Sequence, residues 1–302
     1  MSCTVTVFTP AYNRAYTLER LYNSLVNQTC FDFEWLIVDD GSTDNTKELV
    51  DGFLENNNQF SIRYFFQNNS GKHVAINKGV DLANGYLFLI VDSDDYLIDT
   101  AIEKIIKWES TIKDKYNYAG VSGNKGYANG EMIGDTFRDK FVDATSLERE
   151  KYSIIGDKSE VFYTNVLKQY PFPVYDGEKF ITETVVWYKI AAEGYKIRWF
   201  NEIIYIAEYL DDGLSFDYTK LYANNPKGFA LSVKQNIEFL NYNKSRVNIE
   251  YCNYYQIVKE NTSIKQAADY LGIKQTTLLK AIFLFYIGVA KRKIIRKKND
   301  KE

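Results

Sequence analysis

Apolar runs that look like strands alternate with helical patterns through the first hundred residues. The strand-like runs occupy residues 4–9, 33–38, 61–66 and 87–91. After the first run, Leu18, Leu21 and Leu25 recur at the spacing of one helix face, and similar patterns follow the other runs. Strands that alternate with helices favour βαβ units and a parallel sheet, whose crossovers should be right-handed. The pattern therefore predicts an α/β fold with a mainly parallel sheet flanked by helices.

The pattern changes beyond Trp108. A further strand is expected at residues 118–122, and the Gly-rich, charged stretch 123–150 indicates hairpins or a mobile flap. A helix is predicted over 183–193, followed by strand-like runs at 196–200 and 203–209, and the chain is helical in pattern from 215 onward. We place a boundary near residues 211–214, which separates a domain of residues 1–212 from a helical C-terminal region of residues 213–302.

The strand at residues 87–91 ends in three acids within four positions, Asp92, Asp94 and Asp95. Ligands of open α/β sheets bind at the carboxyl ends of the strands. A D-x-D pair at such an end can hold a hard divalent cation, which in turn holds a diphosphate. The alternative is a plain acidic turn in which Asp95 or Asp99 caps the next helix.

Composition narrows the functional class. The chain has 302 residues, 45% of them hydrophobic, which is typical of a globular protein. A net charge of −3 argues against nucleic acid as a partner. The three cysteines form no C-x-x-C pair and no signal peptide is evident, so we expect a cytoplasmic location. The single histidine, His73, excludes a histidine-rich metal site.

The C-terminal end combines apolar and basic residues. Residues 281–290 are mostly apolar, but ten residues are too few to cross a bilayer, which needs about 20. Two basic clusters follow, at 291–293 and 296–298. This order predicts peripheral contact with an anionic membrane at its inner face. A core helix with a solvated basic tail is the alternative.

Motifs at the ends of the other predicted strands carry a family resemblance. They are Thr-Pro-Ala-Tyr-Asn at 9–13, Val-Asp-Asp-Gly-Ser-Thr-Asp at 38–44, Asn-Ser-Gly-Lys at 69–72 with Ala75, Asn77 and Gly79, and Asp-Ser-Asp-Asp at 92–95. Together, and in this spacing, they resemble the family 2 inverting glycosyltransferases of the GT-A fold. The resemblance covers about residues 1–210, and the third motif is most similar to bacterial enzymes that build surface polysaccharides.

The resemblance implies a GT-A architecture, in which a Rossmann-like, mainly parallel sheet is flanked by helices and followed here by a C-terminal helical extension. It also implies a nucleotide-binding half at about residues 1–110 and an acceptor half at about 111–212. In such enzymes the second Asp of the D-D pair, here Asp40, accepts the uracil N3–H, while Pro10 and Tyr12 line the base. The alternative for Asp-Asp-Gly-Ser is a helix cap with a turn.

The phosphate end of the implied site lies in two further motifs. Lys72 is expected to reach the diphosphate as a point charge. Asp94 would bind Mn²⁺ or Mg²⁺ directly, and Asp92 would contact the ribose or donor sugar, or support the metal through water. Ser93, between them, completes the cofactor-binding residues that the resemblance implies. His73 could contact the substrate or could have a structural role, and the sequence leaves both interpretations open.

Inversion at an anomeric carbon is a single displacement, so a base must accept the proton of the acceptor hydroxyl. The family takes this base from an E-D pair at a helix N-terminus, and Thr184 stands here where the usual Asp would be. Glu183 is therefore the candidate base, with Asp176 and Glu178 as alternatives. The alternative for Glu183 is a first-turn acid that the helix dipole favours.

The expected function is metal-dependent transfer of a sugar, with inversion, from a nucleotide sugar of the UDP type to a hydroxyl of a lipid-linked glycan acceptor in bacterial surface polysaccharide synthesis. A catalytically impaired, sugar-nucleotide-binding partner subunit is a second hypothesis, motivated by Thr184. A nucleotidyltransferase is disfavoured because residues 9–13 are not a Gly-rich loop bearing Arg and Lys.

Overall fold

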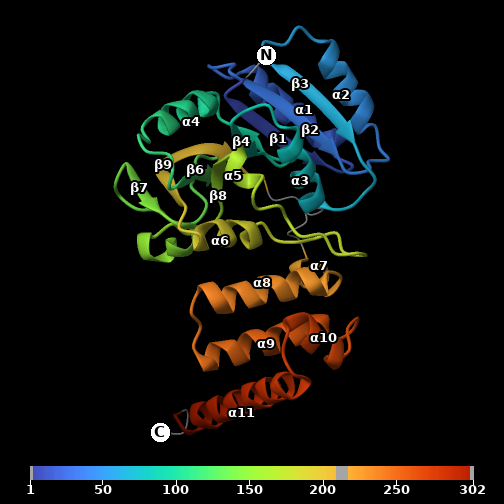
Figure 1. Cartoon of the computed structure of the whole chain (residues 1–302), viewed down its shortest axis with the longest axis vertical. Coiled ribbons are helices and arrows are strands. Elements are labelled where there is room, and N and C mark those ends of the chain that lie inside the picture. Colours follow the sequence, from blue (N-terminus) through green and yellow to red (C-terminus); the bar gives the residue numbers. More distant parts are fainter. Residues whose placement is uncertain (1–2, 209–216, 300–302) are drawn as a thin grey trace. The chain divides into compact units, whose positions relative to one another are not determined.

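A computed structural model describes residues 3–208 and 217–299, with side chains as far as residue 288 (Figure 1). The chain divides into two compact units. The first comprises Met1–Pro173 and Val186–Gly213, and the second comprises Val174–Val185 and Leu214–Glu302. The predicted boundary at residues 211–214 lies outside the described residues. The second unit thus includes twelve residues, 174–185, from the middle of the chain.

The described part of the first unit contains one nine-stranded sheet in the order β3-β2-β1-β4-β8-β6-β9-β5, with β7 paired to β9. The strands are β1 Val5–Ala11, β2 Phe33–Asp39, β3 Ser61–Phe66, β4 Leu87–Ile90, β5 Tyr96–Leu97, β6 Tyr118–Gly126, β7 Phe141–Ala144, β8 Lys158–Tyr163 and β9 Lys196–Ile206. All four strands predicted in the first hundred residues are present, and β3, β2, β1 and β4 are parallel, as expected.

Helices cover this sheet. They are α1 Ala15–Val26, α2 Thr46–Glu55, α3 Lys72–Leu82, α4 Ala101–Ser110, α5 Thr164–Leu167 and α6 Thr184–Ala192, the last of which begins in the second unit. Leu18, Leu21 and Leu25 of α1 are fully buried, which confirms the predicted helix face. Every residue of β1 and β2 is also buried, so both faces of these strands are covered.

The structure corrects two details of the strand prediction. The runs at 196–200 and 203–209 are not separate strands, because β9 is continuous from Lys196 to Ile206. Pro10 does not end β1, which continues to Ala11. Pairing of β1 with β4 stops at Phe8, so Pro10 lies beyond this ladder and its missing N–H removes no hydrogen bond to β4. Beyond β4 the sheet is mixed, since β8 is antiparallel to both β4 and β6.

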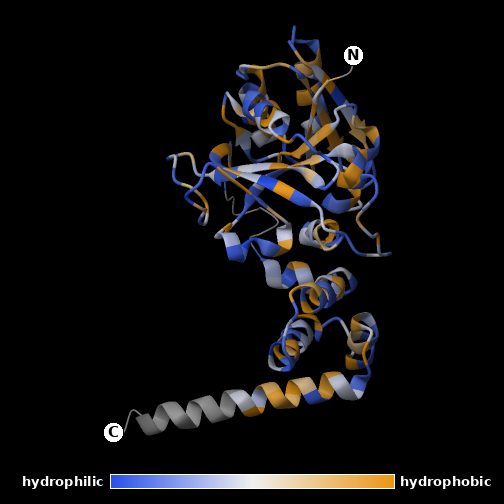
Figure 2. Cartoon of the chain, turned by 60° about the vertical axis from the view of Figure 1, so that its left-hand side comes forward, coloured by the Kyte–Doolittle hydropathy of each residue, from blue (hydrophilic) through white to orange (hydrophobic). Residues whose placement is uncertain are grey.

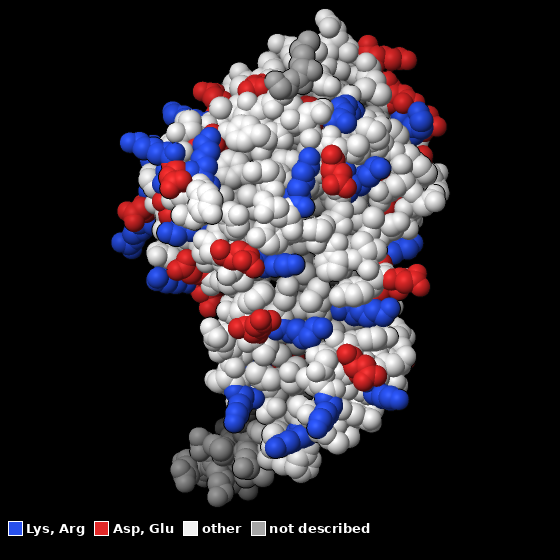
Figure 3. Space-filling view, viewed as in Figure 1, with Lys and Arg blue, Asp and Glu red and all other residues white. Residues whose placement is uncertain are grey.

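The second unit is helical, as predicted. Its helices are α7 Tyr218–Ala223, α8 Pro226–Phe239, α9 Lys244–Val258, α10 Ile264–Leu271 and α11 Gln275–Asn299. Tyr254, Val258, Leu271 and Leu278 are among the buried side chains of its core. Among the described residues, no helix has the length and apolar character needed to span a membrane. On the face shown in Figure 3, cationic and anionic side chains are interspersed, in keeping with the small net charge.

Glu34, near the amino end of β2, is a buried carboxylate whose two oxygens both accept hydrogen bonds. Glu34 is 2% exposed and accepts hydrogen bonds from the Thr6 hydroxyl (2.7 Å), the Asn84 backbone N–H and side-chain amide (2.7 Å each) and Arg63 Nη1 (3.0 Å). Burial alone would raise the pKa of Glu34, but these donors outweigh it and the pKa is lowered. A buried charge with this many partners stabilises the fold only while it remains ionised.

We expect Glu34→Gln to destabilise the protein by about 3 kcal/mol near neutral pH, because Arg63 and Asn84 lose their charged acceptor. The pKa of Glu34 is lowered in the folded state. Its contribution to the free energy of unfolding is therefore present above the ordinary pKa of Glu and is lost as the pH falls through the pKa of the folded state. Urea unfolding at about pH 7 and about pH 3 should therefore show the difference from wild type shrinking in acid. Glu19→Gln, at an exposed position of α1, is the control, and an equal effect of both substitutions would contradict the prediction.

Candidate functional site

The acids that follow β4 form a tight turn at the carboxyl edge of the parallel strands. We call Asp92–Asp95 the acidic turn. The Val91 N–H bonds to the Phe8 carbonyl at 2.8 Å, and the Asp95 N–H closes the turn on the Asp92 carbonyl at 3.1 Å. Ser93 and Asp95 are buried, while Asp92 and Asp94 are partly exposed. The turn thus leaves two carboxylates accessible at the end of a buried strand.

The negative charge of Asp92 is compensated by two lysines, Lys72 and Lys125. Its Oδ1 atom lies 2.7 Å from Lys72 Nζ, and its backbone N–H donates to the Tyr205 hydroxyl at 3.0 Å. Burial would raise the pKa of Asp92, but the charges of Lys72 and Lys125 lower it. Lys125 Nζ lies 4.2 Å from the centre of the Tyr205 ring. Lys72, predicted to bind a diphosphate, therefore lies beside the predicted metal-site acids in this structure.

The other two acids of the turn differ from Asp92. Burial, and then the charge of Asp92, raise the pKa of Asp94, and the hydrogen bond from the residue's own backbone N–H offsets this only in part. Burial and Asp92 also raise the pKa of Asp95, to about 7. Asp95 is nevertheless fully engaged, because it accepts from the Tyr205 hydroxyl at 2.6 Å and from the Glu208 N–H at 2.8 Å. Asp94 is the acid of the turn that is left for a ligand.

Asp40 organises the loop that precedes Lys72. It is 4% exposed and accepts hydrogen bonds from Gln67 Nε2 (2.7 Å), the Ser70 N–H (2.8 Å) and the Gly71 N–H (2.7 Å). Gly71 has φ of +100° and immediately precedes α3, a conformation that glycine adopts without a steric penalty. A carboxylate offers about four acceptor positions, so roughly one remains on Asp40 for a ligand.

Neighbouring residues fasten the first two strand ends together. Asp39 is buried and accepts from the Ser42 N–H at 2.7 Å and the Tyr64 hydroxyl at 2.6 Å. The Asn13 side chain accepts from the Thr43 N–H at 2.8 Å. Pro10 lies within β1, and Tyr12 just beyond it is 49% exposed. The structure thus brings the Pro10, Asp40 and Lys72 segments to the same edge, while the contact of Tyr12 with a base stays a prediction.

The donor set of the acidic turn fits a divalent cation that a phosphate also ligates. The described residues include no group of three His, Cys, Asp or Glu side chains placed to hold a metal. Protein-bound Mg²⁺, however, usually takes one or two carboxylates together with substrate phosphates and water. Asp94 and Asp92 supply two such carboxylates, and their mutual repulsion, visible in the raised pKa of Asp94, would be relieved by a cation.

The candidate bases lie in the second unit, where they occupy different environments. Glu178 is buried and accepts from the N–H groups of Lys227 and Gly228, both at 2.8 Å, at the start of α8. In return, the Asn225 side chain accepts from the N–H groups of residues 179 and 180, at 2.7 and 3.0 Å. Glu178 thus has a structural role as a helix cap. Asp176 is exposed, and Glu183, partly buried, immediately precedes α6.

Sequence reasoning missed several residues that shape the site. Tyr205 and Lys125 lie on β9 and β6, and Glu208 and Arg20 contact the acidic turn from β9's end and from α1. Tyr205 is 113 positions from Asp92 and sits in an ordinary apolar strand pattern. Its full burial could be expected for a central strand, but nothing local shows that its hydroxyl meets the acidic turn.

Comparison with known proteins places this site in a family. Residues 6–161 match the model described as "Glycosyl transferase family 2". The chain is 26% identical over 215 residues to the glycosyltransferase GlyA of Streptococcus pneumoniae, covering 64% of this chain and 30% of that protein. It is 29% identical over 199 residues to the GalNAc(5)-diNAcBac-PP-undecaprenol beta-1,3-glucosyltransferase of Campylobacter jejuni, covering 63% and 60%. The chain thus spans less than two thirds of the length of either relative.

The fold has a counterpart among solved structures. S. aureus TarS 1-349 in complex with UDP-GlcNAc aligns with a TM-score of 0.62 over 94% of this chain and 92% of that one, at 18% identity. This likeness confirms the predicted GT-A architecture of a central sheet flanked by helices, with helices at the C-terminus. The family model spans more than half of the sequence, including β1 to β4 and the acidic turn, and this chain therefore belongs to glycosyl transferase family 2.

Proposed function

We propose that this protein is a metal-dependent, inverting glycosyltransferase that moves a sugar from a UDP-sugar to a hydroxyl of a glycan acceptor. One observation carries the proposal: in a family 2 chain, Lys72, Asp92 and Asp94 meet at the carboxyl edge of the parallel strands. The positive charge of Lys72 and the two partly exposed carboxylates suit a diphosphate that is bound through a metal ion.

The nucleotide would bind between the Asp40 segment and the acidic turn. Asp40 retains an acceptor position for the base, and Pro10 and Tyr12 would line it. Lys72, at the start of α3, would exchange its contact with Asp92 for the diphosphate, to which its compact charge is suited. Asp92 would contact the ribose or donor sugar or support the metal, and Ser93 beside it belongs to the proposed nucleotide-binding residues. The TarS complex with UDP-GlcNAc supports the choice of a UDP-sugar.

Asp94 would hold Mn²⁺ or Mg²⁺, with Asp92 as a second ligand or a support through water. When bound, such a cation neutralises the negative charge that grows on the leaving nucleoside diphosphate. The protein's own part is to keep the Asp94 carboxylate accessible, while a bound cation would offset the burial and the charge of Asp92 that raise its pKa. Asp94 is partly exposed, and Arg20 binds its backbone carbonyl, not its carboxylate.

Glu183 is the base that we propose for the acceptor hydroxyl. Of the two alternatives, Glu178 is already committed to the start of α8 through both of its oxygens, whereas Asp176 is exposed and stays open. Thr184 occupies the place of the usual Asp, and its hydroxyl lies 3.2 Å from that of Thr182. This neutral pair keeps the second hypothesis, a catalytically impaired sugar-nucleotide-binding partner subunit, in view until Glu183 is tested.

The acceptor is proposed to be a lipid-linked oligosaccharide used in bacterial surface polysaccharide synthesis. The Campylobacter relative, whose name describes an undecaprenol-linked acceptor, supports this choice. Peripheral contact with the inner face of the membrane fits α11, where Leu279, Phe283 and Tyr286 are exposed at helical spacing. Figure 2 shows a largely hydrophobic stretch in the part of α11 that is coloured. The basic clusters at residues 291–298 follow in the same helix, where only the backbone is described.

Replacing Asp94 by Ala should lower metal-dependent sugar transfer by more than about a hundredfold, because a direct ligand matters at least as much as the residues that orient one. The assay is release of UDP from a panel of UDP- and GDP-sugars with increasing Mn²⁺. Asp99→Ala, an exposed acid a few residues further on, is the matched control and should behave as wild type. Undiminished transfer by the Asp94 variant would contradict the proposed metal site.

Replacing Glu183 by Gln should reduce turnover by about 10²–10⁴-fold, the usual contribution of a general base, and leave UDP affinity unchanged. Turnover and calorimetric UDP binding should be measured on the same preparation. Asp176→Asn should retain activity, whereas Glu178→Gln should mainly lower thermal stability by weakening the cap of α8. A normal rate for the Glu183 variant would move the base elsewhere, and a wild type that binds UDP but transfers nothing would favour the partner-subunit hypothesis.

A further inference from the structure

Arg20 connects α1 to the acidic turn. Its Nη2 atom donates to the backbone carbonyl of Asp94, and its Nη1 atom forms an ion pair with Glu208 Oε2 at 2.5 Å. The guanidinium also lies over the Tyr96 ring, 5.2 Å from its centre. Both ends of the guanidinium fork are therefore engaged, one by the turn and the other by the residue that follows β9. Arginine's planar group suits this simultaneous use better than the single ammonium of lysine.

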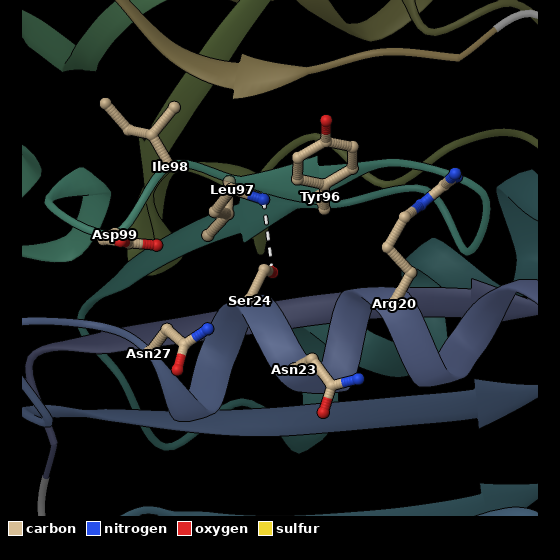
Figure 4. Close-up of a pocket in the computed structure, with 8 residues that line it drawn as sticks. All are labelled: Arg20, Asn23, Ser24, Asn27, Tyr96, Leu97, Ile98 and Asp99. Atoms are coloured by element: carbon tan, nitrogen blue, oxygen red, sulfur yellow. Dashed lines mark hydrogen bonds between the residues drawn. The ribbon is translucent and has the colours of Figure 1, made fainter. Parts of the chain in front are cut away.

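The helix that carries Arg20 is itself fixed against the segment after the acidic turn. Ser24 Oγ accepts from the Leu97 N–H at 3.3 Å, and the Gln28 side chain donates to the Ile98 carbonyl at 2.8 Å and accepts from the Ile102 N–H at 3.1 Å. Figure 4 shows Arg20 and Ser24 on α1 across from Tyr96 and Leu97, around an open pocket of about 410 Å³. Arg20 thus acts from a rigid position.

The side chains of Tyr205 and Arg20 hold the acidic turn. The Tyr205 hydroxyl binds the Asp92 N–H and the Asp95 carboxylate, so it fixes the first and last residues of the turn. Between them, the Asp94 carbonyl is held by Arg20. The Asp94–Asp95 peptide is thus held on both sides, through its carbonyl by Arg20 and through the Asp95 N–H by the Asp92 carbonyl at 3.1 Å. Arg20 supplies the contact that comes from outside the turn.

Arg20 affects Asp94 through the position of the backbone. The charges of Asp92, Arg14 and Lys72 act on the Asp94 carboxyl group. The charge of Arg20 is instead compensated by Glu208, and its contact with Asp94 is to the carbonyl. Loss of Arg20 should therefore make the position of Asp94 less defined, without a large change in the charge of its carboxyl group.

We propose that Arg20 is a positioning residue for the cation site, which it serves by fixing the Asp94 peptide from α1 while Glu208 and Tyr96 hold its guanidinium in place. The proposal rests on the proposed function, because it assumes that Asp94 binds the metal. It assigns a role in metal affinity to a helix residue that reaches the proposed metal ligand through its backbone carbonyl. Residues that orient metal ligands typically change metal affinity by about 10–100-fold when they are replaced.

The test is Mn²⁺ binding to the full chain in the presence of UDP, followed by the electron paramagnetic resonance signal of free Mn²⁺, with thermal stability measured in parallel. Arg20→Met removes the fork and keeps the aliphatic stem, whereas Arg20→Lys keeps the charge. Glu208→Gln removes the ion pair and leaves the backbone N–H that binds Asp95. Asn23→Ala, which lines the same pocket, is the control.

We expect Arg20→Met to weaken Mn²⁺ binding by about tenfold, Arg20→Lys and Glu208→Gln by less, and Asn23→Ala not at all. Transfer by Arg20→Met should recover at high Mn²⁺, since the chemistry is intact. Wild-type Mn²⁺ affinity in both Arg20 variants would overturn the proposal. It would also be overturned if Arg20→Lys lost activity and added Mn²⁺ did not restore it. If the wild type bound no Mn²⁺ with UDP, the proposed metal-dependent function would fail first, and this proposal with it.

Discussion

The site depends on how one short turn accommodates three negative charges. Two unit charges about 4 Å apart repel by roughly 4 kcal/mol at the effective dielectric constant typical of protein surfaces. The acidic turn reduces this cost with the ion pair between Lys72 and Asp92, the nearby charge of Lys125, and the hydrogen bonds that Asp95 receives. The compensation stops short of Asp94, whose pKa stays raised. A fold that needed only stability would have no reason to keep this acid.

A second carboxylate in the same sheet supports this interpretation. Glu34, on β2, is as buried as any acid in the turn, yet four donors surround it and its pKa is lowered. The chain can therefore satisfy a buried acid completely where the structure alone requires it. The difference between Glu34 and Asp94 follows from position, because the carboxyl edge of the parallel strands is where such sheets bind ligands.

Much of this arrangement follows from local sequence. The strand and helix periods of the first hundred residues predicted β1 to β4 and the helices between them, and the rule that strand ends share an edge brought Asp40, Lys72 and Asp92 into one region. The continuity of β9 and of β1 past Pro10 could not be predicted, because both depend on which neighbour each residue pairs with. The same limit hid Tyr205 and Arg20.

The hydrogen bonds of Asp40 link the two ends of the candidate nucleotide site. Its carboxylate holds the Gly71 N–H, the next residue is Lys72, and Lys72 pairs with Asp92. Asp40, which we propose binds the base, therefore also positions Lys72, which we propose binds the diphosphate. A base that took up the last acceptor position of Asp40 would compete with, or tighten, the contacts that place Lys72. Recognition of the base and placement of the diphosphate would then be coupled through a single buried carboxylate.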